Sequence, residues 1–230
     1  MVALLHMCPR KRYAIFDLDG TLLDTEPLYT VAIDELLAPY GRRLRPEVKS
    51  RMMGREVAEA GAILINALQL PFAPKDYVTM LEPILRRVMG GAAEIPGAGE
   101  FVAALAQRGV GVALATSSHE ELALHKLAAR PLRAFFRAMV FGDDARVERP
   151  KPAPDILLEA AQRIGAEPAA CVVFEDSLAG AQAARAAGME VVVVAGGPHS
   201  AQHVPWALAH VPDFRELDPA VWFFGVPPPI

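Results

Sequence analysis

Apolar and polar residues follow two different patterns along the chain, and these patterns divide it into two parts. The short apolar run Tyr13–Phe16 predicts a buried strand of a parallel sheet. From about residue 28 to residue 89 the apolar positions recur at helical spacing, with breaks at Tyr40-Gly41 and at 71–74. Beyond Glu94 the pattern changes to short apolar runs that alternate with helical stretches. The chain therefore predicts a helical segment inserted into an alternating strand and helix segment.

The expected elements follow from these patterns. In the inserted segment we expect helices over residues 28–37, 46–53, 56–70 and 75–89. In the alternating segment we expect strands over 110–115, 138–141, 170–174 and 191–194, and helices over 101–107, 120–129, 155–164 and 178–187. Strands that alternate with helices of this length favour a parallel sheet with right-handed crossovers. We predict an α/β fold, with a Rossmann-like parallel-sheet core of residues 10–23 and 92–230 and a small helical domain of residues 24–91.

Composition narrows the class of protein. Of the 230 residues, 53% are hydrophobic and 22% are charged, which is typical of a globular protein. The net charge of −4 gives no basic field for a nucleic acid polymer, and no apolar run reaches the roughly 18 residues of a membrane span. The basic cluster Arg10-Lys11-Arg12 follows the apolar start, which is the wrong order for a secretory signal. Two cysteines, Cys8 and Cys171, suit a reducing compartment, and we expect a cytoplasmic monomer.

Polar residues gather where the predicted strands end. They are Asp17, Asp19, Thr116, Ser117, Glu175 and Asp176. Because the carboxyl ends of parallel strands meet at one edge of a sheet, we expect these side chains to converge there. Lys151 lies in a loop that opens a helix, and this helix leads into the next strand. Taken singly, each of these residues also fits a turn, a helix cap or a solvated loop, and it is their common position that favours a site.

The residue types suit phosphoryl transfer. A phosphate ester repels an attacking anion until charge is offset, so catalysis depends on positioning and electrostatic stabilisation. The carboxyl groups of Asp17, Asp19 and Asp176 suit Mg²⁺, which would let the Asp17 carboxylate approach phosphorus. Thr116 and Ser117 offer hydroxyl and N–H donors to phosphoryl oxygens. Lys151 supplies a positive charge.

The stretch Asp17-Leu18-Asp19-Gly20-Thr21, after four apolar residues, resembles the signature of the haloacid dehalogenase (HAD) superfamily. The resemblance implies that Asp17 is a phosphoryl-accepting nucleophile and that Asp19 is the general acid and base, with a backbone carbonyl on Mg²⁺. It implies that Thr116 and Lys151 belong to the second and third motifs. Glu175 and Asp176 match the fourth motif, and Asp176 is the expected direct metal ligand of the two. The implied set of metal-binding residues is therefore Asp17, Asp19, Glu175 and Asp176. The expected activity is a Mg²⁺-dependent phosphomonoesterase with an aspartyl-phosphate intermediate, and the helical domain resembles the superfamily's cap.

Several stretches in both parts resemble the pseudouridine-5′-phosphatases within this superfamily: 24–26, 48–55, 67–71, 113–118, 141–144 and 224–227. This likeness implies a small phosphorylated metabolite as substrate, a nucleotide-type monophosphate such as pseudouridine 5′-phosphate, with Glu26 and Arg55 of the cap in contact with it. Phosphatases for sugar phosphates, glycerol phosphate or phosphoglycolate share the core motifs and stay open. A β-phosphoglucomutase-like mutase is disfavoured because Tyr29 replaces the cap histidine of that family. A catalytically idle binding module is disfavoured because Asp17 is intact.

Overall fold

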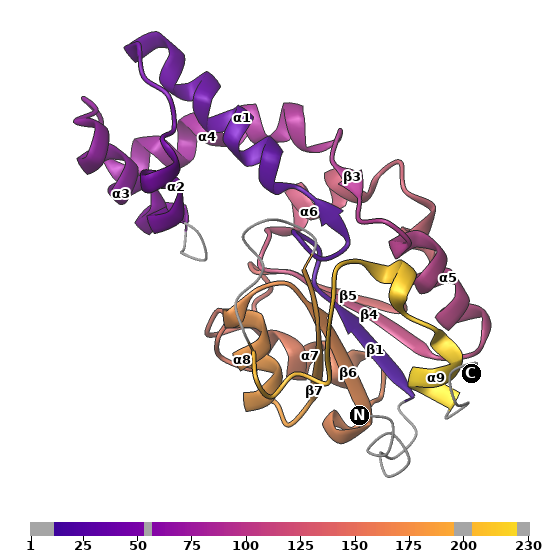
Figure 1. Ribbon diagram of the computed structural model, residues 1–230. Helices are drawn as coiled ribbons and strands as arrows, with labels where there is room; N and C mark the ends of the chain where they lie inside the picture. The colour runs from indigo at the N-terminus through magenta and orange to yellow at the C-terminus, as the bar shows by residue number, and fades with distance from the viewer. Residues whose placement is uncertain (1–11, 53–56, 196–203, 225–230) are drawn as a thin grey trace. The chain divides into compact units, whose positions relative to one another are not determined.

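The computed structural model describes residues 12–52, 57–195 and 204–224 (Figure 1). The chain divides into two compact units, one running through Asp24 and resuming at Ala93, the other spanning Thr25–Ala92. The boundaries expected from the sequence, at residues 24 and 91, differ from these by one residue. Each unit is described below by itself.

The larger unit is built on a parallel sheet with the strand order β5-β4-β1-β6-β7-β8. The strands are β1 (Tyr13–Phe16), β4 (Gly111–Ala115), β5 (Ala138–Val140), β6 (Cys171–Glu175), β7 (Glu190–Val194) and β8 (Ala209–Val211). Strand β1 lies in the middle, paired in parallel with β4 on one side and β6 on the other. The expected α/β fold with a Rossmann-like parallel sheet is confirmed.

Helices cover both faces of this sheet. They are α5 (Ala98–Gln107), α6 (Glu120–Leu127), α7 (Asp155–Arg163), α8 (Leu178–Ala186) and α9 (Pro219–Phe224). Helices α5 and α9 lie on one side, and α7 and α8 on the other (Figure 1). With both faces covered, a central strand must be apolar throughout, which explains the unbroken run in β1.

Phe16 and Ile15 show how β1 joins the two layers. Phe16 stacks on Phe174 of β6 with ring centroids 4.6 Å apart, and Phe101 of α5 packs edge-on against both rings. Ile15 points to the opposite face, into the cluster of residues from α7 and α8. Neighbouring side chains on a strand face opposite ways, so β1 is anchored in two cores. The carboxyl end of β1 therefore has a fixed position.

Several features of the larger unit were not predicted, among them helix α9 near the end of the chain. Strand β8 has only three residues, and the middle one is an exposed histidine, so the sequence shows no apolar run there. Strands β2 (Leu23–Asp24) and β3 (Ala93–Glu94) form an antiparallel pair where the chain leaves and re-enters this unit. Two-residue strands leave no periodicity that a sequence pattern can reveal.

The smaller unit is helical, as expected. It contains α1 (Glu26–Leu37), α2 (Pro46–Met52), α3 (Val57–Leu68) and α4 (Pro74–Met89). On α4, the residues Tyr77, Leu81, Leu85 and Met89 recur every four positions and are all buried. This spacing places them along one face of the helix, which packs on α1 and α3. In the described part of the chain, no helix combines the length and the apolar character that crossing a bilayer requires.

Candidate active site

The candidate site begins where β1 ends. The N–H of Asp17 still donates to the Phe174 carbonyl of β6 at 3.0 Å, so Asp17 continues the strand. The chain then turns back, with the N–H groups of Leu22 and Leu23 donating to the Leu18 carbonyl at 3.0 and 2.9 Å. This tight loop holds Asp17 and Asp19 at the carboxyl edge of the sheet, where open α/β folds bind ligands.

Gly20 is required at the tip of this loop for two reasons. Its φ of +85° lies in the left-handed region, which favours glycine. A Cβ at this position would also collide with the carboxylate of Asp176, whose Cγ would be only 2.7 Å away. Asp176 is held on its other side by the Thr21 hydroxyl, which donates to Oδ1 at 3.3 Å. The glycine therefore lets the fourth-motif acid approach the first-motif loop.

Lys151 joins the first and fourth motifs. Its Nζ lies 2.7 Å from Asp17 Oδ1, 2.8 Å from Glu175 Oε1 and 3.1 Å from the Ala115 carbonyl oxygen. The other Glu175 oxygen, Oε2, accepts from the Ser177 N–H at 2.7 Å and the Ser177 hydroxyl at 2.9 Å. The structure thus brings these residues together across more than 130 positions of sequence, and both oxygens of Glu175 are occupied by donors.

The electrostatics of this cluster are strongly perturbed. Burial raises the pKa of Asp17 to about 7; the Lys151 ammonium opposes this rise and the charge of Glu175 adds to it. Burial also raises the pKa of Asp176 well above its usual range, and the charges of Glu175 and Asp17 add to the effect. Burial alone would lower the pKa of Lys151, but Asp17 and Glu175 raise it above its usual value. Buried carboxyl groups with raised pKa values favour a bound proton or a bound cation.

Asp19 is held by a lysine that the sequence analysis missed. Lys126 of α6 lies with Nζ 2.6 Å from Asp19 Oδ1 and 2.8 Å from Oδ2. The Ser118 hydroxyl donates to Asp19 Oδ2 at 2.7 Å and accepts from Lys126 at 2.9 Å. The sequence did carry a signal, because Lys126 lies on the same helix face as the buried Ala123 and Leu127, where an apolar residue is expected.

Thr116 and Ser117 follow β4 as predicted. Thr116 is buried, and its Oγ1 accepts from the Ser118 N–H at 3.1 Å, which leaves its hydroxyl proton to donate elsewhere. Ser117 is exposed, and its carbonyl packs so closely on Gly142 that a Cβ there would collide with it. Within this tripeptide it is the Ser118 side chain, and not that of Ser117, that contacts Asp19.

The charge of the whole cluster fits a divalent cation. When all are ionised, its six side chains carry a net charge of −2: Asp17, Asp19, Glu175, Asp176, Lys126 and Lys151. Within 12–52, 57–195 and 204–224, no three His, Cys, Asp or Glu side chains form a metal cluster. Mg²⁺ needs fewer side chains, because it keeps several waters and substrate oxygens in its octahedron. The carboxylates of Asp17 and Asp176, with the Asp19 backbone carbonyl, could hold it.

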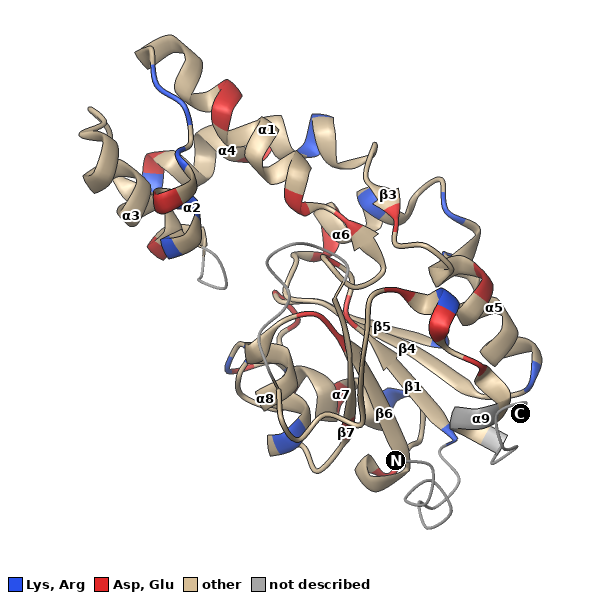
Figure 2. Cartoon of the chain, in the orientation of Figure 1, with Lys and Arg blue, Asp and Glu red and all other residues tan. Residues whose placement is uncertain are grey.

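Two predicted substrate contacts belong to the helical unit. Glu26 lies in the first turn of α1 and forms an ion pair with Lys49 of α2. Lys49 also donates to the Thr30 hydroxyl at 2.6 Å. Arg55 lies outside the described residues. Acidic and basic residues are interspersed along both units (Figure 2).

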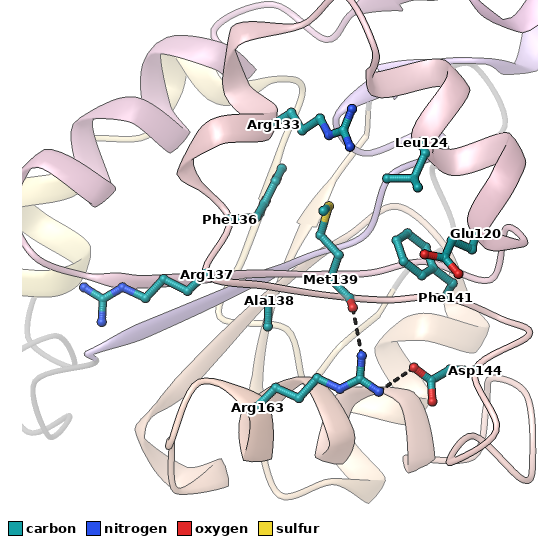
Figure 3. Close-up of a pocket in the computed structure, with 10 residues that line it drawn as sticks. All are labelled: Glu120, Leu124, Arg133, Phe136, Arg137, Ala138, Met139, Phe141, Asp144 and Arg163. Carbon is teal, nitrogen blue, oxygen red and sulfur yellow. Dashed lines mark hydrogen bonds and ion pairs between the residues drawn. The ribbon is translucent and has the colours of Figure 1, made fainter.

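A separate hollow runs along the edge strand β5, with Phe136, Met139 and Phe141 among its lining residues (Figure 3). Arg163 reaches into it, but its guanidinium donates to the Met139 carbonyl at 3.1 Å and pairs with Asp144. None of the predicted site residues lines this hollow. We assign the chemistry to the carboxyl edge of the sheet and not to this hollow.

A buried carboxylate, a second acid two residues away and a buried lysine lie at the carboxyl edge of a Rossmann-like sheet, an arrangement that suits phosphate ester chemistry. Comparison with known proteins agrees, since the haloacid dehalogenase-like hydrolase family model matches residues 11–188. A probable pseudouridine-5′-phosphatase of Drosophila melanogaster is 37% identical over 222 residues, 94% of this chain and 94% of that protein. The fructose-1-phosphate phosphatase of Escherichia coli is 37% identical over 186 residues, 80% of this chain and 97% of that protein.

Solved structures agree with this result. The crystal structure of CbbY from Rhodobacter sphaeroides in complex with phosphate matches with a TM-score of 0.78 at 25% identity, covering 92% of this chain and 99% of that one. The chain belongs to the haloacid dehalogenase-like hydrolases. It is a hydrolase of phosphoric monoesters, which confirms the activity class and the resemblance that its motifs indicated.

Proposed function

We propose that the enzyme is a Mg²⁺-dependent phosphomonoesterase that works through an aspartyl-phosphate at Asp17. The observation that carries this proposal is the Asp17 carboxylate itself, which is buried at the end of the central strand and held 2.7 Å from the Lys151 ammonium. A pKa of about 7 allows a substantial ionised fraction at neutral pH, and a bound cation favours the ionised form further. A desolvated, positioned carboxylate is what nucleophilic attack on phosphorus requires.

The reaction takes two displacements. In the first, an Asp17 carboxylate oxygen attacks phosphorus, the bond from phosphorus to the ester oxygen breaks, and the Asp19 carboxyl group gives its proton to the leaving oxygen. In the second, Asp19 accepts a proton from a water molecule as the water oxygen attacks phosphorus. The bond from phosphorus to Asp17 then breaks and inorganic phosphate leaves. Asp17 returns as a carboxylate and Asp19 returns protonated, so the cycle is closed.

The remaining residues bind and orient the phosphoryl group. Lys151 offsets the charge of Asp17 and of the phosphoryl oxygens, and Thr116 and Ser117 donate hydrogen bonds to those oxygens. A bound Mg²⁺ would add positive charge at the phosphoryl oxygens, with Asp17, Asp176 and the Asp19 carbonyl as ligands. Both oxygens of Glu175 accept from Lys151 and Ser177. We therefore assign Glu175 the role of holding Lys151 and not of ligating the metal.

For the substrate we propose a nucleotide-type monophosphate such as pseudouridine 5′-phosphate. The likeness to the Drosophila protein supports this choice because it spans 94% of the chain and so includes the helical unit. We propose that this unit is the substrate-selecting cap, with Glu26 and Arg55 as its contacts. The two cysteines, with Cys171 a buried thiol, are consistent with a cytoplasmic enzyme. The expected monomer stays a prediction, which sedimentation of the purified protein tests.

A panel of monophosphates with Mg²⁺ tests the substrate. Phosphate release is measured from pseudouridine 5′-phosphate, uridine 5′-phosphate, glycerol 3-phosphate, 2-deoxyglucose 6-phosphate and phosphoglycolate, with the Asp17→Asn protein as the blank. We expect a strong preference for pseudouridine 5′-phosphate over its uridine isomer. Both substrates release the same phosphate, and they differ only in the nucleoside, which the cap would contact. Equal turnover of the two isomers would show that the substrate assignment is wrong.

A phosphatase for a sugar phosphate is the second candidate. The 37% identity to the Escherichia coli fructose-1-phosphate phosphatase supports it, and the core motifs suit either substrate. Preference for a sugar or glycerol ester in the same panel would select this candidate and leave the chemistry unchanged. Tyr29 at the position of the mutase histidine argues against a phosphomutase.

A further inference from the structure

Lys126 is buried at a position where the helix pattern predicts an apolar residue. Its side chain is 0% exposed, and it shares the inner face of α6 with Ala123 and Leu127. Lysine is almost never fully buried unless it is paired, because an ammonium group loses its hydration there. Such a position needs a reason beyond packing, since leucine or methionine would fill it without that cost.

The contacts of Lys126 supply a reason. Its Nζ reaches both carboxylate oxygens of Asp19, at 2.6 and 2.8 Å, and the Ser118 hydroxyl reaches Oδ2 at 2.7 Å. Both donors lie about 100 positions or more from Asp19 in the sequence, one on α6 and one in the loop after β4. Charge-assisted hydrogen bonds on both oxygens resist rotation of the carboxyl group. The Asp19 side chain is therefore fixed by parts of the fold other than its own loop.

The two buried lysines of the site have separate partners. Lys151 binds Asp17 and Glu175, whereas Lys126 binds Asp19 and Ser118. In the proposed reaction Asp17 attacks phosphorus and Asp19 moves protons. Each of the two reacting acids thus has its own ammonium group.

We propose that Lys126 is a positioning residue that acts through Asp19, with Ser118 as the second group that holds the same carboxyl. This inference rests on the proposed function, in which Asp19 protonates the leaving oxygen. A general acid must lie within hydrogen-bond reach of the atom that takes its proton, and small misplacements are costly. Lys126 itself does not touch the substrate.

Leaving-group dependence of the rate tests this role. The alcohol of a sugar or nucleoside phosphate leaves poorly without a proton, whereas p-nitrophenolate leaves easily. The values of kcat/KM report the steps through ester cleavage, which include proton delivery by Asp19. For Lys126→Met we expect a fall of about 100-fold with the best alkyl ester of the panel and of less than about 10-fold with p-nitrophenyl phosphate.

Two further variants keep the test decisive. Ser118→Ala removes one hydrogen bond to Asp19 without leaving a buried charge, so it should fold and show a smaller selective loss in the same direction. Glu159→Gln disturbs a buried ion pair with Arg146 and Arg163 elsewhere in the same unit and should leave the ratio of the two kcat/KM values unchanged. If Lys126→Met does not fold, the ratio of the two kcat/KM values in Ser118→Ala decides whether the inference holds.

Equal losses with both substrates, in folded Lys126→Met and in Ser118→Ala, would overturn the inference. The proposed function has its own check, because Asp17→Asn must abolish turnover of both substrates. Retained turnover in Asp17→Asn would refute the role of Asp17 as the nucleophile. If Asp17→Asn is inactive and Lys126→Met loses activity equally with both substrates, only the positioning role of Lys126 is refuted.

Discussion

The metal-free protein should lose stability as the pH rises from 5 to 8, and the raised pKa of Asp17 is one cause. A solvated aspartate has a pKa near 3.8, whereas burial raises the pKa of Asp17 to about 7. In this window the folded protein therefore holds a proton that the unfolded chain has released. Because the native state binds more protons, the free energy of unfolding falls as the pH rises, until Asp17 has lost its proton in both states.

The size of the effect follows from the two pKa values. Each pH unit between 5 and 7 over which only the folded state keeps the proton lowers the free energy of unfolding by about 1.4 kcal/mol, or about 3 kcal/mol in total. Asp176, whose pKa is also raised, acts in the same direction. Asp155 and Asp213 have lowered pKa values, so their contribution is lost only as the pH falls below about 4, outside the window.

Urea unfolding at pH 5, 6, 7 and 8, in EDTA and in Mg²⁺, measures this dependence for the wild-type protein and for Asp17→Asn. The asparagine cannot titrate, so the variant should lack about 3 kcal/mol of the fall between pH 5 and 8. Mg²⁺ binds the ionised carboxylates, so its stabilising effect on the wild type should grow with pH. Parallel curves for the two proteins in EDTA would refute the raised pKa of Asp17.

Three substitutions, the first with a matched control, test other parts of the account. Gly20→Ala should abolish most Mg²⁺-dependent activity because its Cβ displaces Asp176. Gly109→Ala is the control, because Gly109 also has a positive φ, +81°, but open space around it. Urea unfolding of this control should show only about 1–2 kcal/mol of backbone strain, and its activity should be retained. Lys151→Met should lower the free energy of unfolding by about 3–5 kcal/mol, because it leaves buried carboxylates without their cation. Arg55→Ala should raise KM for the preferred substrate far more than for p-nitrophenyl phosphate, and equal effects would rule out a cap contact.

The sheet and the polar residues at its carboxyl edge could be predicted because their signals are local. Strand β1 is buried on both faces and so appears as an apolar run, and the acids that follow it mark the point where the strand ends. The start of α1 also has a local signal, with Pro27 in its first turn. Parallel topology then places Asp17, Thr116 and Glu175 at one edge without any further information.

The features that the sequence analysis missed depend on contacts between residues far apart in the chain, which no local pattern encodes. Lys126 meets Asp19 across 107 positions, and a lysine near the end of a helix ordinarily faces water. Strand β8 forms only because β7 offers its free side, since its three residues carry little β-character of their own. In both cases tertiary contacts decide the outcome, and the sequence shows at most a lysine on an apolar helix face.

The central claim is that phosphate passes through a covalent bond to Asp17. Acid quenching in the first turnover, with a substrate labelled at phosphorus, followed by mass spectrometry of the peptides, tests it most directly. We predict a phosphoryl group on the peptide containing Asp17, in an amount that rises before free phosphate reaches its steady rate, and no label in Asp17→Asn. Steady release of phosphate with no labelled Asp17 peptide, and with Asp17→Asn still active, would contradict the account.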